Sequence, residues 1–115
     1  MCSSDLKRCF IEKQFEICGK IVEKHKQAQD REQIKVSITP YYHPILPLIC
    51  DTNSAHQAAP AMILPKNRFA HPENTAWHVN NAVDYYEKSF GRKPSGMWPS
   101  EGSVSNDMAS IVADS

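Results

Sequence analysis

The order of helical and extended patterns in this 115-residue chain predicts an α/β fold in which helices alternate with parallel strands. Two long segments have helical periodicity, and each is followed by a short segment of strand-like residues. A long proline-rich connection joins the two halves. Two strands cannot form a covered parallel sheet by themselves, so we expect an incomplete piece of such an architecture.

The first expected helix spans about residues 4–29, where apolar residues recur at i, i+3, i+4 spacing and the other face is Lys, Glu and Gln. This periodicity places Cys9 and Cys18 on a face that we expect to be buried. The four cysteines include no C-x-x-C pair and no His at zinc spacing. We therefore expect reduced thiols, Cys2 and Cys50 included, with no disulfide framework, no metal and no cofactor.

The first expected strand covers about residues 34–39, where apolar and polar residues alternate and β-branched types are frequent. Pro40 ends it. A long loop then runs over residues 40–72 and carries prolines at 40, 44, 47, 60, 65 and 72 without a sustained period. Within it, residues 44–50 are a candidate for one short helix. Loops of this length in small domains commonly build or cover a site.

The second expected helix spans about residues 73–90. Pro72 suits its first turn, and Gly91 stands where a left-handed glycine would end it. The apolar residues that recur at helical spacing are Ala76, Val79, Val83 and Tyr86.

A second expected strand, about residues 95–98, is stopped by Pro99. A loop over residues 99–104 follows it. Ser105 then suits the N-cap of a helix that begins within residues 105–115.

Composition excludes several classes of partner. Thirteen Lys and Arg residues balance thirteen Asp and Glu residues, so the chain has no net basic field with which to attract nucleic acid or anionic lipid. No window has the apolar length of a membrane span, and the first eight residues have no apolar signal-peptide core. We therefore expect a cytoplasmic protein with no nucleic-acid or membrane partner, and the sequence carries no signal of its oligomeric state.

The loops after the two expected strands are where chemistry would sit, because the carboxyl ends of parallel strands meet at one edge of a sheet. The first contains Tyr41, Tyr42 and His43, and the second places Glu101 beside Trp98. A carboxylate held on stiff backbone next to an aromatic ring suits a sugar substrate. The plainer alternatives are a helix-dipole role for the carboxylate and loop hydrogen bonding for the imidazole.

The aromatic residues have a plainer alternative as well, which is packing. It applies to the tyrosines of the first loop and to three residues of the second helix, Trp77, Tyr85 and Tyr86. For Trp77 and for the pair Tyr85 and Tyr86 we expect packing.

Two stretches go beyond general pattern: SITPYYHPILPL over residues 37–48 and GMWPSEGSVS over residues 96–105. Both resemble conserved blocks of glycoside hydrolase family 57, the amylolytic family of α-amylase, amylopullulanase, 4-α-glucanotransferase and branching-enzyme types. The runs at residues 69–73 and 85–94 are similar to that family in order and spacing. The resemblance covers the chain from about residue 5 onward.

The resemblance implies a partial (β/α) barrel of the incomplete seven-fold, TIM-barrel-like type. It also implies a retaining mechanism on α-glucans such as starch, glycogen or maltooligosaccharides, by hydrolysis or glucan transfer. The Glu of the family's Trp-x-x-Glu block is the nucleophile, which here is Glu101. Trp98, His43, Tyr41 and Tyr42 would line the sugar subsites.

The second carboxylate of the family, an Asp, would lie outside this chain, so we expect a fragment of the catalytic barrel that is inactive alone. Lys35 stands where the family usually has a Glu. These departures leave two alternatives open: a non-catalytic carbohydrate-binding or regulatory remnant, and a structural piece that needs the rest of a barrel in order to fold.

Overall fold

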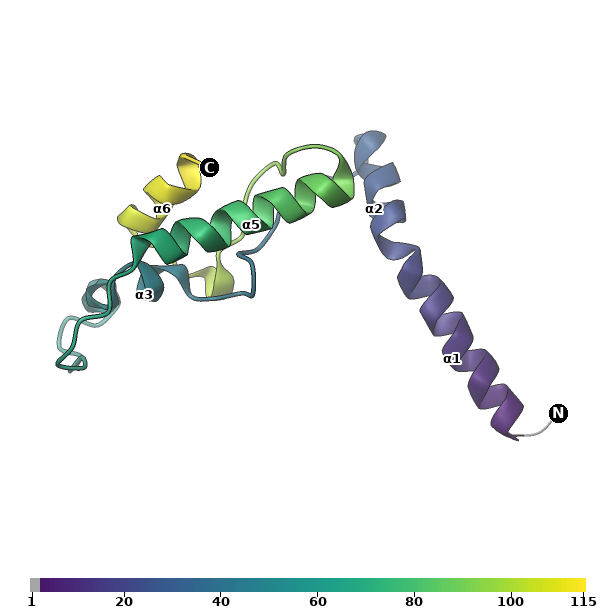
Figure 1. Cartoon of the computed structure of the whole chain (residues 1–115), viewed down its shortest axis with the longest axis horizontal. Coiled ribbons are helices and arrows are strands. Elements are labelled where there is room, and N and C mark those ends of the chain that lie inside the picture. The colour runs from purple at the N-terminus through teal and green to yellow at the C-terminus, as the bar shows by residue number, and fades with distance from the viewer. Residues whose placement is uncertain (1–2) are drawn as a thin grey trace. The chain divides into compact units, whose positions relative to one another are not determined.

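The computed structural model describes residues 3–115, and it divides the chain into two compact units, one up to Lys35 and one over Val36–Ser115. The first unit holds α1 (Ser3–Gly19) and α2 (Ile21–Asp30). The second unit is also helical (Figure 1). Its elements are α3 (Leu46–Cys50), η1 (Thr52–Ser54), α4 (Ala55–Ala58), α5 (Pro72–Phe90), η2 (Ser100–Gly102) and α6 (Asn106–Ala113).

The predicted α/β fold is wrong, because residues 3–115 contain no strand and no sheet. The two expected strands reduce to one parallel bridge between Ile38 and Met97. Ile38 donates to the carbonyl oxygen of Gly96 at 3.0 Å, and Trp98 donates to that of Ile38 at 2.7 Å. An isolated parallel pair has no neighbouring strand on either edge, so pairing does not extend. A partial (β/α) barrel of alternating helices and parallel strands is therefore not what this chain forms.

The single helix expected over residues 4–29 is two helices that meet at Lys20. Gly19 lies at the junction, where its low helix propensity favours a break. Cys9 and Cys18 are exposed, so their predicted burial is wrong; Cys2 lies outside the described residues. Helical periodicity identifies an apolar face but does not supply a partner for it. No helix within residues 3–115 is long and apolar enough to cross a bilayer.

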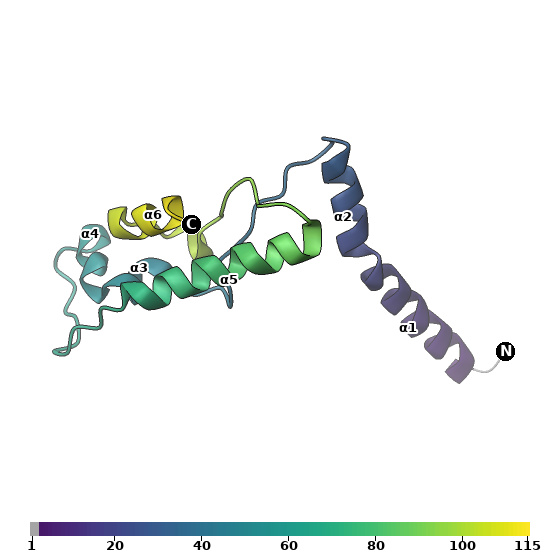
Figure 2. The ribbon, with the colours of Figure 1, turned by 45° about the horizontal axis from the view of Figure 1, so that its top comes forward.

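Helix α5 is the centre of the second unit, and α3 and α6 pack beside it (Figures 1 and 2). It begins with Pro72 in its first turn, as the sequence predicts. It ends at Gly91, whose φ of 75° is the left-handed conformation that glycine adopts without strain. The Gly91 amide donates to the carbonyl oxygen of Glu87 at 2.7 Å, which satisfies a carbonyl at the helix end.

The core of the second unit is small. Leu46 of α3, Val79 of α5 and Met108 of α6 form one buried cluster. Ser105 starts α6 as predicted, because its Oγ accepts a hydrogen bond from the Met108 amide at 3.3 Å. Beside the cluster, burial raises the pKa of the Cys50 thiol above its usual range.

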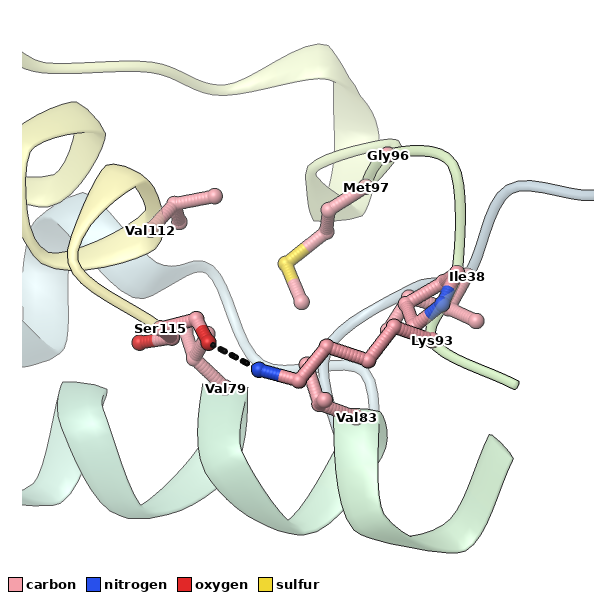
Figure 3. A pocket seen from close by; sticks show the side chains of 9 residues that line it. Ile38, Val79, Val83, Lys93, Gly96, Met97, Val112 and Ser115 are labelled. Atoms are coloured by element: carbon pink, nitrogen blue, oxygen red, sulfur yellow. Dashed lines mark hydrogen bonds between the residues drawn. The ribbon is translucent and has the colours of Figure 1, made fainter. Parts of the chain in front are cut away.

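A cavity of about 130 Å³ lies between α5, α6 and the bridged segments (Figure 3). Met97 and Val112 extend toward it, and the Lys93 ammonium donates to the carbonyl oxygen of Ser115 at 3.2 Å across its edge. The lining is mainly apolar and includes no acidic or histidine side chain. It is therefore a gap in the packing beneath the bridge.

The long loop expected over residues 40–72 contains α3, η1 and α4, and hydrogen bonds close its second half. Two guanidinium nitrogens of Arg68 donate hydrogen bonds to the Asp51 carboxylate, and the Nε–Oδ1 distance is 2.9 Å. The Thr52 amide donates to the carbonyl oxygen of Phe69 at 2.9 Å, and the His71 amide to that of Ile49 at 3.0 Å. These hydrogen bonds therefore close the loop immediately before α5.

We expect the ion pair between Asp51 and Arg68, which closes the loop before α5, to contribute less stability in acid. The paired Arg68 guanidinium, followed by the Asn53 amide, holds the pKa of the Asp51 carboxyl below its usual range. A lowered folded-state pKa contributes stability that is full above the unfolded value near about 4 and is lost as pH falls through the folded value. Urea midpoints at pH 7 and pH 3 should therefore differ more in wild type than in Asp51→Asn.

Arg68→Gln should reduce the acid dependence in the same way, because it removes the main cause of the shift. The double variant should then change little beyond either single one. Equal acid losses in wild type and in both variants would contradict a role for this pair.

Candidate functional site

The Ile38–Met97 bridge brings the two sequence-predicted loops together. Each loop begins two residues after its bridged residue, so the first carries His43 and the second carries Glu101 to the same place. His43 Nε2 lies 3.3 Å from Glu101 Oε1, although 58 residues separate them in sequence. This contact joins the two blocks that sequence analysis singled out.

Thr39 orients the His43 ring, since its Oγ1 lies 2.9 Å from Nδ1. A carboxylate can only accept, so the hydrogen bond to Glu101 requires a hydrogen on Nε2. In the neutral ring Nδ1 is then an acceptor for the Thr39 hydroxyl. Thr39 was not among the predicted site residues, although it lies four residues before His43 in the same block.

The site residues have unusual backbone conformations. Tyr42, His43 and Glu101 have φ values of 63°, 57° and 56°. These values lie in the left-handed region, which residues other than glycine rarely adopt. Such residues cost about 1–3 kcal/mol each and cluster at functional sites. Tight turns hold them there: His43 donates to the carbonyl oxygen of Pro40 at 2.8 Å, and Gly102 to that of Pro99 at 3.0 Å.

The Glu101 side chain is open to solvent, with 71% of its surface exposed. Within residues 3–115 the only polar side chain that it contacts is that of His43. Trp98 is also exposed. The edge of its ring lies close to Gly102, the residue that follows Glu101, at ordinary van der Waals distance from the point that a Cβ atom on Gly102 would occupy. Both the carboxylate and the indole are therefore accessible to a ligand.

The two tyrosines of the first loop are held against α5. His78 Nδ1 donates to the Tyr41 carbonyl oxygen at 2.6 Å, and the Tyr41 amide donates to the His78 carbonyl oxygen at 3.2 Å. Tyr42 lies beside Tyr41, with ring centroids 4.5 Å apart. No sequence pattern predicts His78 as a site residue, because it lies on α5 between Trp77 and Val79, which are both expected to pack.

Trp77 and Tyr85 differ from the expectation that they pack inside. They are 48% and 64% exposed, while Tyr86 is buried and stacks on Phe90. Their spacing of eight residues places them on one side of α5, away from its buried stripe of Thr75, Val79, Ala82 and Tyr86. That spacing is the signal that could have separated them from the core residues.

Two further observations bear on the chemistry of the site. Ser100, directly before Glu101, is 1% exposed, and its Oγ has no hydrogen-bond partner within residues 3–115. In the same described range, no three His, Cys, Asp or Glu side chains group together as a metal site requires.

Comparison with known proteins identifies one family. The family model described as Glycosyl hydrolase family 57 matches residues 6–115, which includes both loops of the site. No curated protein and no solved structure matches the chain significantly.

Proposed function

Because this chain belongs to glycosyl hydrolase family 57, we propose that it is part of a retaining glycosidase or glucanotransferase whose carboxylate nucleophile is Glu101. Membership implies a carbohydrate substrate, and we propose an α-glucan such as starch, glycogen or a maltooligosaccharide. The observation that carries the proposal is the contact between Glu101 and His43 across the two matched blocks.

In the proposed mechanism, a Glu101 oxygen attacks the anomeric carbon and the bond to the leaving oxygen breaks, which forms a glycosyl ester. The leaving oxygen must receive a proton, and water must later cleave the ester with help from a base. Trp98 would stack on a sugar ring, while His43 would hold the carboxylate in place. Tyr41 and Tyr42 would line the next part of the subsite.

We also propose that this chain alone does not turn over natural glucans. A retaining pair needs two carboxyl groups about 5 Å apart. Within residues 3–115, Glu101 contacts the imidazole of His43 and no acidic side chain. Asp107 and Asp114 lie on and just after α6, and neither bonds to Glu101. Turnover of maltooligosaccharides that Glu101→Gln abolishes would contradict this part of the proposal.

The nucleophile can be tested without a natural leaving group. In 5-fluoro-α-glucosyl fluoride the fluoride leaves without protonation, so the Glu101 carboxylate alone can form the ester, and the ring fluorine slows its hydrolysis. We expect intact-mass measurement to show one added glycosyl group, located at Glu101 by peptide mapping. Glu101→Gln should not be labelled, because its amide is a poor nucleophile.

Asp107→Asn is a matched control, because Asp107 is an exposed carboxylate of the same unit and lies in the first turn of α6. It should be labelled as wild type is. Equal labelling of wild type and Glu101→Gln, or a label on another residue, would contradict the assignment of the nucleophile.

A second candidate function is carbohydrate binding without chemistry. The exposure of Trp98 and Tyr42, 65% and 78%, favours it because exposed rings can stack on sugars whether or not a reaction follows. Binding of maltooligosaccharides by calorimetry together with no labelling of Glu101 would favour this alternative. No measurable heat would remove it. The cytoplasmic location expected from the sequence stays a prediction.

A further inference from the structure

Helix α5 carries a solvent-exposed aromatic surface, formed by Trp77 and Tyr85 together with the two loop tyrosines that rest on them. Tyr42 stacks on Trp77, with ring centroids 6.4 Å apart and planes inclined by 27°. Tyr41 meets Trp77 edge-on at 5.9 Å and Tyr85 at 6.3 Å. We call these four residues the aromatic face.

The aromatic face is not part of the core. Its most exposed rings are Tyr42 at 78%, Tyr85 at 64% and Trp77 at 48%. The core instead uses the opposite stripe of α5, which contains Val79. Contiguous exposed aromatic rings on a folded unit mark interaction surfaces, among them ligand-binding ones.

A polar group lies within this surface. Asn81 stands midway between Trp77 and Tyr85 on α5, one helical turn from each. Its amide nitrogen donates to the Trp77 carbonyl oxygen at 2.8 Å, and its side-chain oxygen has no partner within residues 3–115. Rings that offer flat apolar faces and a planar amide that offers an acceptor are the two features that a pyranose ring can use together.

We propose that Trp77 and Tyr85 extend the sugar site beyond the part that Tyr41 and Tyr42 line, so that the aromatic face binds glucose units of the same α-glucan chain away from the bond that Glu101 attacks. The inference rests on the proposed function, since it assigns further residues to the same substrate. Continuity supports it: Tyr42 stacks on Trp77, and the next residue, His43, contacts Glu101. The left-handed backbone at Tyr42 and His43 turns the chain between these two places.

The rings and the amide that form this surface are uncharged and suit a glucan. The exposed Asp84 and Lys88 stand on the same side of α5, three and seven residues after Asn81, and both can hydrogen-bond to sugar hydroxyls. Trp77 and Tyr85 are eight residues apart on α5, which is about 12 Å along the helix axis. A ligand that covers both rings therefore needs more than one sugar unit, so the subsite should matter for long maltooligosaccharides and not for a single glucose.

Calorimetric titration tests this dependence on length. We expect Trp77→Ala to weaken maltoheptaose binding about three- to tenfold, as the loss of one stacked ring should. Tyr85→Ala should weaken it by a smaller factor. Phe69→Ala is the matched control, because Phe69 is an exposed ring of the same unit that packs on His71, outside the aromatic face. It should bind as wild type does.

Labelling by 5-fluoro-α-glucosyl fluoride separates the possible failures, because this reagent carries a single sugar and its label reports the reactivity of the Glu101 carboxylate. Phe69→Ala should keep both the labelling rate and the maltoheptaose affinity of wild type, whereas Trp77→Ala should lose affinity for maltoheptaose by a larger factor than it loses labelling rate. Loss of labelling in Trp77→Ala would show that the ring only positions the loop, which overturns the subsite. Unchanged maltoheptaose binding in both Trp77→Ala and Tyr85→Ala, with normal labelling, would also overturn it. No labelling of wild type, with binding still weakened by Trp77→Ala, would contradict the nucleophile and leave the subsite supported.

Discussion

Replacing Leu46 by alanine is expected to lower the free energy of unfolding of the second unit by about 2–5 kcal/mol. Leu46 is 1% exposed and joins α3 to Val79 and Met108, so truncation removes contacts with both neighbouring helices and leaves a cavity. The core has few other buried side chains to absorb this loss. Urea unfolding followed by far-UV circular dichroism should show a much lower midpoint or no cooperative transition.

Leu48→Ala is the matched control, because it makes the same chemical change on the same helix. Leu48 is 39% exposed, so its truncation should cost about 1 kcal/mol or less. Similar losses for Leu46→Ala and Leu48→Ala would contradict the assignment of the core. The comparison also bears on the site, since α3 directly follows the loop that carries His43.

Replacing Glu101 by glycine is expected to abolish glycosyl labelling and at the same time to stabilise the fold. The φ of 56° at Glu101 costs a residue with a side chain about 1–2 kcal/mol, which glycine avoids. The flexibility of glycine in the unfolded chain offsets part of the gain. The net increase in the free energy of unfolding should be about 0.5–1 kcal/mol, measured by urea unfolding.

The neighbouring residue provides the opposite change as a control. Gly102 has a φ of 67°, and a side chain there would meet Trp98 only at an ordinary contact distance of 4.0 Å. Gly102→Ala should therefore lose about 1 kcal/mol through backbone strain alone. If Glu101→Gly were less stable than wild type while Gly102→Ala was unchanged, the strain argument at this loop would be wrong. If Glu101→Gly is more stable than wild type, the native Glu101 lowers the stability of the fold, and its retention is explained by function.

The features that sequence predicted well are those with local causes. Helix α5 runs over Pro72–Phe90, close to the expected 73–90, because a proline at its start and a glycine after its end act within one turn. The Ser105 cap is a bond between residues three apart. The short helix α3 also falls inside the candidate stretch 44–50.

The features that sequence predicted poorly depend on partners elsewhere in the chain. Residues 34–39 and 95–98 have strand-like composition, but a strand needs neighbours along its length, and here only Ile38 and Met97 pair. Cys9 and Cys18 have helical spacing suited to burial, but they are exposed. A hydrophobic pattern identifies residues that could be buried, but packing against other elements determines which residues are buried.

The sequence by itself determined the family of the chain, because the family model matches residues 6–115. It also supplied the candidate site residues, which lie in two contiguous blocks whose residue types suit the proposed chemistry. Only the tertiary structure decided that the chain is helical, that His43 meets Glu101, and that Trp77 and Tyr85 face solvent beside the loop tyrosines. The physical reason is distance along the chain. Contacts across tens of residues form only after loop closure and helix packing, and no local propensity encodes them.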